Sequence, residues 1–304
     1  MISRIALSPT GPEISRVVYG TWRLLDDAVG ATPAALLERL HRCVDLGVTT
    51  IDTAEIYGLY EVERAIGAAL ALDRALRDRL EIITKCGIYI PSAADPRRRV
   101  SAYNATAAQI IRSAEQSLRL MGLDHIDVLL VHRPDWLTSA DDTAEGLNRL
   151  IKDGKIRRAG VSNYNVQQFE LLNTRVELPL VTNQVEFSLL HMDPIVDGTA
   201  DQCQRVRIRP MAWSPLGQGR LMRTDDAAAQ RVQRTIEAFG DKYGGASVDQ
   251  IAYAWIMAHP SQPIPIIGSN RIDRVAAAAR SADIVLERDD WFALWTAAQG
   301  RGIP

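Results

Sequence analysis

The chain has 304 residues, of which 47% are hydrophobic and 24% are charged. This composition can bury a large core, and chains of this length commonly fold as one unit, so residues 1–304 are expected to form a single domain. The formal net charge of -2 gives no electrostatic reason to expect nucleic acid or an anionic membrane as a partner.

Cysteine spacing and the first residues bear on where the protein works. Cys43, Cys86 and Cys203 are far apart and form no C-x-x-C pair, which argues against disulfides and against a structural zinc ion. The first residues lack the apolar segment of a signal peptide, and no apolar run is long enough to span a bilayer. We therefore expect a cytoplasmic protein without a metal ion and without a membrane partner.

The chain begins with a predicted hairpin over residues 3–15, and then short β-branched runs alternate with longer amphipathic runs. The predicted strands are Val17–Tyr19, Thr49–Asp52, Glu81–Thr84, Ile126–Val131, Ile156–Val161, Leu180–Asn183, Arg209–Ala212 and Ile264–Ile267. The helices between them are predicted to begin near Pro33, Tyr60, Thr106, Ala140, Asn165, Asp193, Ser247 and Arg271. The tail Asp289–Ala298 carries aromatic residues at helical spacing and predicts one more helix.

Eight strand and helix units in a chain of this length favour an α/β fold, the closed (β/α)8 TIM barrel. The N-terminal β-hairpin could plug the bottom of this barrel, and the extra C-terminal helix would pack on its outside. In such barrels the functional side chains collect at the C-terminal ends of the strands and in the loops that follow them.

Four chemically distinct side chains fall at three consecutive strand ends. Asp52 ends the second predicted strand, Tyr57 lies in the loop after it, Lys85 follows the third strand and His132 follows the fourth. Each one alone is more often a cap, a surface charge or a packing residue. Together they should converge at one mouth of the barrel, where a buried Lys85 would need Asp52 as its counter-charge.

This set of groups suits proton donation to a carbonyl. A free phenol has a pKa of about 10, which is too high for efficient proton transfer near neutral pH. An adjacent ammonium should lower that pKa, and a carboxylate should hold the ammonium in place. We expect Tyr57 to act as the general acid, tuned by Lys85 and Asp52, while His132 orients the carbonyl or relays the proton.

Six segments resemble the aldo-keto reductase family, in the family's order and over nearly the whole chain: GVTTIDTAEIYG, ITKCG, DVLLVHRPD, GVSNY, TNQVEFSLLH and MAWSPLGQGRL. Within the family, the chain is similar to the YdhF-like branch of bacterial oxidoreductases, in GTWRL, RPMAWS and SQPIPIIGS. The resemblance implies NADPH-dependent reduction of an aldehyde or ketone by hydride transfer, with Asp52, Tyr57, Lys85 and His132 as the catalytic residues.

The resemblance also implies a set of cofactor-binding residues. They are Thr21, Trp22, Ser162, Asn163, Gln184, Trp213, Ser214, Leu216, Gly217, Gly219, Ser269, Arg271 and Arg274. In the family, side chains such as Asn163 and Gln184 bond the nicotinamide carboxamide, and an aromatic ring like that of Trp213 stacks on the nicotinamide. The segment SPLGQGRL would form a small-residue loop whose backbone N–H groups approach the pyrophosphate.

The segment expected at the adenine end departs from the family pattern. Gly268 takes the place of a lysine that in many relatives contacts the 2'-phosphate, and Ala278 takes the place of an asparagine. Ser269 and Arg274 match the pattern, and Arg271 could supply the missing cation. NADPH is therefore the expected cofactor, and NADH is the alternative.

The expected partner is a small-molecule carbonyl substrate. Trp22, Tyr89, Trp136 and the loop 88–103 could line its pocket, which would suit an apolar or aromatic carbonyl. Two other functions stay open. One is a cofactor-sensing regulatory subunit with slow turnover, and the other is a Schiff-base lyase that acts through Lys85.

Overall fold

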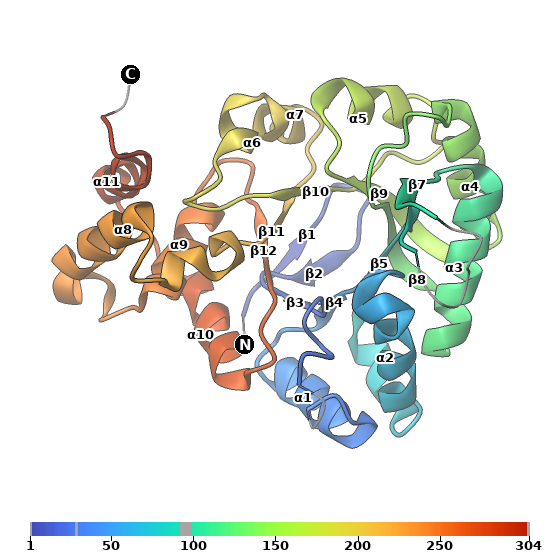
Figure 1. Ribbon diagram of the computed structural model, residues 1–304, viewed down its shortest axis with the longest axis horizontal. Coiled ribbons are helices and arrows are strands. Elements are labelled where there is room, and N and C mark those ends of the chain that lie inside the picture. The colour runs from blue at the N-terminus through green and yellow to red at the C-terminus, as the bar shows by residue number, and fades with distance from the viewer. Residues whose placement is uncertain (1, 28–29, 92–98, 303–304) are drawn as a thin grey trace.

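The computed structural model describes residues 2–27, 30–91 and 99–302. Within them, eight parallel strands close into a barrel in the order β10-β11-β12-β3-β4-β5-β8-β9. The barrel strands are β3 (Val18–Gly20), β4 (Thr50–Asp52), β5 (Glu81–Cys86), β8 (Ile126–Val131), β9 (Ile156–Ser162), β10 (Asn183–Glu186), β11 (Met211–Trp213) and β12 (Ile264–Ile267). The predicted (β/α)8 TIM barrel is confirmed (Figure 1).

A ring of helices surrounds the barrel (Figure 1). It consists of α1 (Pro33–Asp45), α2 (Val62–Leu70), α3 (Ala107–Met121), α4 (Ala140–Lys152), α5 (Val166–Asn173), α6 (Asp193–Val196), α7 (Thr199–Arg205), α9 (Val248–Met257) and α10 (Ile272–Arg280). Several of these helices begin at a side chain that caps the first turn. The hydroxyl of Thr32 accepts from the backbone of Ala35 before α1, and Asn165 and Gln168 form a capping box before α5.

The N-terminal hairpin closes the bottom of the barrel, as predicted. Its strands are β1 (Arg4–Ala6) and β2 (Glu13–Ser15), which pair antiparallel. Leu7 and Ile14 are fully buried and pack in one cluster with Val18 and Ile83 of the barrel strands. The backbone N–H of Arg209, just before β11, donates to Leu7 O across 2.8 Å. The plug fills the lower end of the barrel, so the C-terminal ends of the strands form the end where a ligand is expected.

The predicted C-terminal helix is α11 (Arg288–Gln299), and it packs beside α8 (Ala227–Ala238) outside the ring (Figure 1). Trp291 of α11 stacks on Trp255 of α9, with ring centroids 4.7 Å apart and an interplanar angle of 9°. Each of the two indole N–H groups donates to the other residue's backbone carbonyl at 3.0 Å. Both groups are therefore satisfied within a mostly apolar contact.

The structure differs from the sequence prediction in four elements. Strand β10 covers Asn183–Glu186 instead of Leu180–Asn183, because the polar side chains of this strand find partners inside the barrel mouth. Helix α8 was not predicted. Part of the predicted loop 88–103 pairs as β6 (Ile88–Tyr89) and β7 (Ala102–Tyr103), while residues 92–98 of that loop lie outside the described residues. The helix predicted near Asp193 is split into α6 and α7 at Gly198, which has a φ of 90°.

Candidate active site

Lys85 lies at the centre of the site and is completely buried, at 0% exposure. Its Nζ donates to Asp52 Oδ1 at 2.6 Å, to Thr53 O at 2.8 Å and to Tyr57 OH at 3.0 Å. These three bonds use all three ammonium protons. Burial by itself would lower the pKa of Lys85, but Asp52 and Tyr57 together outweigh it and raise that pKa. Lys85 is therefore held as a cation.

Tyr57 is positioned by a tight turn after β4, where Gly58 has a left-handed φ of 55°. Glycine adopts this φ without strain, and a Cβ atom at position 58 would lie 2.6 Å from a methyl carbon of Leu25, which would have to move. The Tyr57 ring meets the ring of Trp22 edge-on, with centroids 4.9 Å apart, and that of His132 at 6.1 Å.

Lys85 lowers the pKa of Tyr57, as expected, but the net pKa of Tyr57 is raised above its ordinary value. Burial of the phenol raises the pKa of Tyr57, the charge and hydrogen bond of Lys85 lower it, and the charge of Asp52 raises it further. Burial wins because the ring is enclosed on nearly all sides, whereas the ammonium is partly neutralised by its own carboxylate. Tyr57 therefore carries its proton at neutral pH, and Lys85 limits the cost of giving it up.

His132 follows β8, and its backbone N–H donates to Cys86 O at 2.9 Å. Burial and the nearby charges of Lys85 and Arg133 hold the pKa of His132 well below its ordinary value. The imidazole is therefore neutral at neutral pH. Its Nδ1 atom is buried and has no hydrogen-bond partner among the residues that the structure describes.

Gln184 contacts Asp52 across the barrel. Its Nε2 donates to Asp52 Oδ2 at 2.7 Å, so the two carboxylate oxygens are used separately, one by Gln184 and one by Lys85. β10 and β4 lie on opposite sides of the closed barrel, so this bond spans the barrel interior. Thr21 adds two more bonds, since its backbone N–H and its hydroxyl both donate to Asp52 O, at 2.9 and 3.0 Å. The sequence analysis missed the Gln184 contact, which no local pattern indicates.

A second chain of hydrogen bonds runs along the ends of β9, β10 and β11. The indole N–H of Trp213 donates to Asn163 Oδ1 at 3.0 Å, and Asn163 Nδ2 donates to Ser162 Oγ at 2.8 Å. Ser162 Oγ in turn donates to Gln184 O at 2.8 Å. The structure thus places these four predicted cofactor residues side by side at the mouth that holds Tyr57.

The sequence profile of the Aldo/keto reductase family matches residues 16–298, which include every residue of this site. The chain belongs to this family. Oxidoreductase YdhF of Escherichia coli is 44% identical over 304 residues and covers 100% of each chain. A 6-dehydroglucose reductase of Agrobacterium fabrum is 41% identical, over 99% of this chain and 100% of its own. This aldo-keto reductase is therefore an NAD(P)H-dependent oxidoreductase, as its oxidoreductase relatives indicate.

Solved structures of aldo-keto reductases share the fold of this family member. The thermostable aldo-keto reductase Tm1743, solved with the inhibitor epalrestat, has a TM-score of 0.81 at 26% identity, covering 97% of this chain and 100% of its own. An aldo-keto reductase of Klebsiella pneumoniae, solved with NADPH, has a TM-score of 0.78 at 28% identity, covering 97% of this chain and 94% of its own. The predicted family and the predicted fold are both confirmed.

The loop after β11, where the sequence predicts pyrophosphate contacts, has an unusual backbone. Ser214, Gly217, Gln218 and Gly219 all have positive φ, at 49°, 57°, 58° and 88°. Left-handed residues among right-handed ones can turn backbone N–H groups toward an anion. In this loop the N–H groups of Gly217 and Gly219 already donate to Ser214 O at 2.8 Å and to Leu216 O at 3.1 Å. Space is also available, because a Cβ at Gly219 would meet no atom within 4 Å. The remaining member of the predicted loop set, Leu216, is partly buried beneath this turn.

The predicted adenine end is the loop after β12 and the first turn of α10. Arg271 donates from Nη2 and Nε to the Asp273 carboxylate, at 2.6 and 3.2 Å, and its backbone N–H donates to Ser269 Oγ at 3.3 Å. Arg274 is exposed and makes no ion pair with any described residue. The sequence analysis missed Asn270, which donates to Arg23 O at 2.7 Å and accepts from Tyr19 OH at 3.1 Å. Asn270 thereby ties this loop to the loop after β3.

Aromatic residues expected to line the substrate pocket lie around the mouth. Trp22 is 59% exposed, and its ring contacts Tyr57 directly. Trp136 is 81% exposed and meets the Tyr103 ring edge-on at 5.8 Å. Tyr89 is half-buried in β6. Large exposed aromatic rings can provide an apolar platform for a ligand, and that of Trp22 lies against Tyr57.

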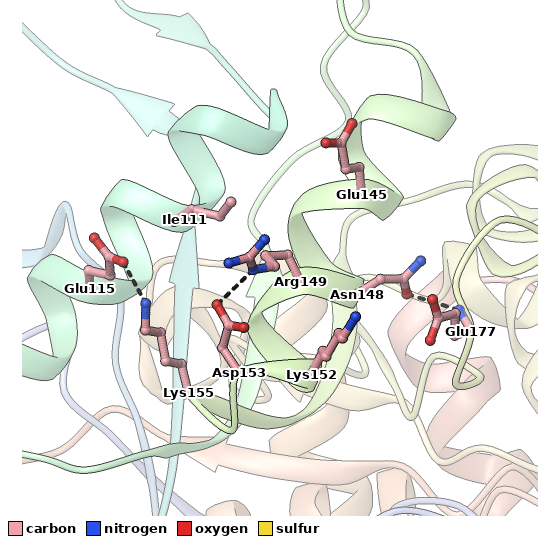
Figure 2. Close-up of a pocket in the computed structure, with 9 residues that line it drawn as sticks. All are labelled: Ile111, Glu115, Glu145, Asn148, Arg149, Lys152, Asp153, Lys155 and Glu177. Carbon is pink, nitrogen blue, oxygen red and sulfur yellow. Dashed lines mark hydrogen bonds and ion pairs between the residues drawn. The ribbon is translucent and has the colours of Figure 1, made fainter.

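A separate groove lies on the outer face between α3 and α4 (Figure 2). Its charged side chains largely pair with one another, Lys155 with Glu115 at 2.6 Å and Arg149 with Asp153 at 2.9 Å. None of its lining residues belongs to the predicted site. Within residues 2–27, 30–91 and 99–302, no group of His, Cys, Asp and Glu side chains is placed to hold a metal ion, and no helix is long and apolar enough to cross a membrane.

Proposed function

We propose that this protein reduces an aldehyde or ketone to an alcohol with NADPH, and that Tyr57 is the general acid. The observation that carries the proposal is the arrangement around the buried Lys85, whose Nζ joins Asp52 Oδ1 at 2.6 Å to Tyr57 OH at 3.0 Å at the mouth of the barrel. We also propose that residues 1–304 form one domain. Its three buried free cysteines, Cys43, Cys86 and Cys203, suit work in the reducing cytoplasm.

In this mechanism each residue has one task. A nicotinamide cofactor, when bound, would supply the hydride that the carbonyl carbon takes up. Tyr57 OH gives its proton to the carbonyl oxygen, and Lys85 stabilises the phenolate that forms. Asp52 keeps Lys85 charged and in place. His132 is neutral, so its one ring N–H can donate a hydrogen bond to the same oxygen, and it lacks the acidic second proton of an imidazolium that would compete with Tyr57.

The cofactor would lie across the ends of β9, β10 and β11. The carboxamide would meet Ser162, Asn163 and Gln184, and the ring would lie on Trp213. The pyrophosphate would bind the loop after β11. The positive φ values of this loop support that placement. Arg274 makes no ion pair among the described residues and is therefore our choice for the 2'-phosphate, with Ser269 and Arg271 beside it. NADH remains the alternative cofactor.

The substrate class is best sought among aldehydes. Two relatives at 41% and 35% identity are named 6-dehydroglucose reductase, so a sugar aldehyde belongs in the first panel. The exposed rings of Trp22 and Trp136 equally suit an aromatic aldehyde. The decisive experiment follows NADPH absorbance with both kinds of aldehyde. Absence of turnover with every aldehyde, despite tight NADPH binding, would favour a cofactor-sensing regulatory subunit instead.

The Schiff-base lyase is the weaker alternative. Attack on a carbonyl needs a neutral amine with a free lone pair. The raised pKa of Lys85 and its three hydrogen bonds oppose that state. Borohydride trapping of a substrate on Lys85 would restore this alternative.

A further inference from the structure

The orientation of the Gln184 amide is fixed by Asp52. Both residues are 2% exposed, and Gln184 Nε2 lies 2.7 Å from Asp52 Oδ2. An ionised carboxylate only accepts hydrogen bonds, so the amide nitrogen must face it and the amide oxygen must point elsewhere. Gln184 Oε1 accepts from none of the described residues, and it is not sealed from solvent. The Gln184 amide therefore has an oxygen that is open to a ligand and a nitrogen that is bonded to Asp52.

The neighbouring amide does not offer the same opening. Asn163 Oδ1 already accepts from the indole N–H of Trp213 at 3.0 Å, and its Nδ2 donates to Ser162 Oγ at 2.8 Å. Of these two amides at the barrel mouth, Gln184 thus has the unoccupied oxygen. A ligand that places an N–H donor there would satisfy it, and a primary carboxamide is such a group.

We propose that Gln184 is a positioning residue that relays occupation of the cofactor site to Tyr57 through Asp52 and Lys85. The proposal rests on the proposed function, since it takes Tyr57 as the proton donor. A donor on Oε1 polarises the amide and strengthens the bond from Nε2 to Asp52. The electrostatic effect of the Asp52 charge on Lys85 and Tyr57 then becomes weaker.

The sign of the effect follows from the charges around the phenol. The negative charge of Asp52 raises the pKa of Tyr57, so a stronger hydrogen bond to Asp52 lowers that pKa. Lys85 keeps its bond to Tyr57 throughout, and His132 is neutral. Neither residue therefore offsets the fall in the pKa of Tyr57. Behind β5, the buried carboxyl of Glu63 accepts from Thr84 and Ser117. Burial raises the pKa of Glu63, and these two bonds and the charge of Lys85 oppose the rise. That group is untouched by any change at Gln184.

The first arm of the test measures binding. NADPH is compared with an analogue in which an acetyl group replaces the carboxamide, which keeps the ring and removes the N–H donors. Tryptophan fluorescence titration gives both dissociation constants. The parent protein should lose about 3- to 10-fold in affinity on this exchange, the range of one neutral hydrogen bond. Gln184→Met should show no such loss, because methionine has no amide oxygen to accept from the carboxamide.

The second arm measures the apparent pKa at which reduction is lost on the alkaline side. In the parent protein this apparent pKa should be higher with the acetyl analogue than with NADPH. In Gln184→Met and in Asp52→Asn it should not depend on the cofactor. Asp52→Asn removes the charge through which the relay acts, so it tests the relay independently of Gln184→Met. Thermal unfolding of each variant shows whether it is folded.

The outcomes separate the relay from the proposed function. If the apparent pKa differs between the two cofactors by the same amount in the parent protein and in both variants, the relay is wrong. The proposed reductase function would be unaffected by that result. If the acetyl analogue binds the parent as tightly as NADPH does, the open oxygen of Gln184 has no carboxamide partner and the relay is also wrong. A parent protein that reduces no carbonyl with either cofactor would instead overturn the proposed function.

Discussion

The indole nitrogen of Trp213 and the side-chain oxygen of Asn163 lie 3.0 Å apart and form a hydrogen bond between the ends of β11 and β9. Asn163 holds this position with a left-handed φ of 60°, which an asparagine tolerates better than most residues. The bond fixes the plane of the indole. A ring that is held in one plane loses little entropy when a flat ligand stacks on it.

This bond gives the first prediction. Trp213→Ala should weaken NADPH binding strongly, and Trp213→Phe should weaken it less, because phenylalanine keeps a ring but loses the N–H donor. Asn163→Leu should resemble Trp213→Phe, since either change removes the bond, worth about 1 kcal/mol. Fluorescence titration measures all three. Unchanged affinity and an unchanged cofactor spectrum in Trp213→Ala would show that the ring does not stack on the cofactor.

The second prediction concerns the phenol. Tyr57→Phe removes only a hydroxyl, so the barrel and the cofactor site should persist, while reduction should fall by about 100- to 10,000-fold, as for a lost general acid. Tyr60→Phe is the matched control, because Tyr60 lies in the same turn as Tyr57. Its hydroxyl accepts from Ile90 N at 3.1 Å and so also makes a hydrogen bond. NADPH absorbance and NADPH binding are measured together. A Tyr57→Phe variant with near-parent turnover would show that this turn is structural.

The third prediction is the pH range of reduction. Burial raises the pKa of Tyr57 above its ordinary value of 10, so the phenol keeps its proton throughout the neutral range. The rate should therefore hold as pH rises and fall only when Tyr57 itself ionises, above about pH 10. A pH profile of kcat measures this limit. A fall near pH 7 to 8 that persists in Tyr57→Phe would assign the limit to another group.

The fourth prediction concerns the buried ion pair. Lys85→Met should lower the free energy of unfolding by about 3–5 kcal/mol, because it leaves the Asp52 carboxylate buried without its cation. The pKa of Lys85 is raised in the folded protein, so its stabilising contribution is present below the unfolded pKa and lost as pH rises through the folded value. The difference in the free energy of unfolding between the parent and Lys85→Met should accordingly become smaller at strongly alkaline pH. Urea unfolding of both proteins at several pH values measures it.

A double variant provides the control for this pair. Asp52→Asn with Lys85→Met removes both charges and should recover part of the lost stability, since no unpaired ion stays buried. It should recover no activity. If the double variant is as unstable as the sum of the single changes, the two side chains do not stabilise each other.

The fifth prediction distinguishes two arginines at the expected adenine end. Arg274→Ala should cost NADPH about 1.5–3 kcal/mol of binding free energy, as for a lost bond to a charged group, and should leave NADH almost unaffected. Arg271→Ala should cost less, because Arg271 is bonded to Asp273 and must give up that partner. Arg280→Ala, at the far end of α10, is the control. Equal affinities of the parent for NADPH and NADH would refute this assignment.

Sequence reasoning located most of the fold because its signals are local and repeated. β-branched runs at strand positions and capped amphipathic helices recur along the chain, so the eight-fold alternation survives errors at single boundaries. It also placed Asp52, Tyr57 and Lys85 together, because consecutive parallel strands of a barrel end at the same rim. The extra helix α11 followed from the helical spacing of its aromatic residues.

Only the tertiary structure decided the rest. The bond from Gln184 to Asp52 joins residues 132 positions apart on opposite strands of the barrel, and such a partner cannot be read from either segment alone. The upward shift in the pKa of Tyr57 depends on how deeply the ring is buried, and burial is the sum of contacts from several loops. The sequence by itself determined which groups are present and at which strand ends they lie. Their distances, their partners and the balance between burial and charge arise when the barrel closes, because hydrogen bonds and desolvation depend on neighbours in space.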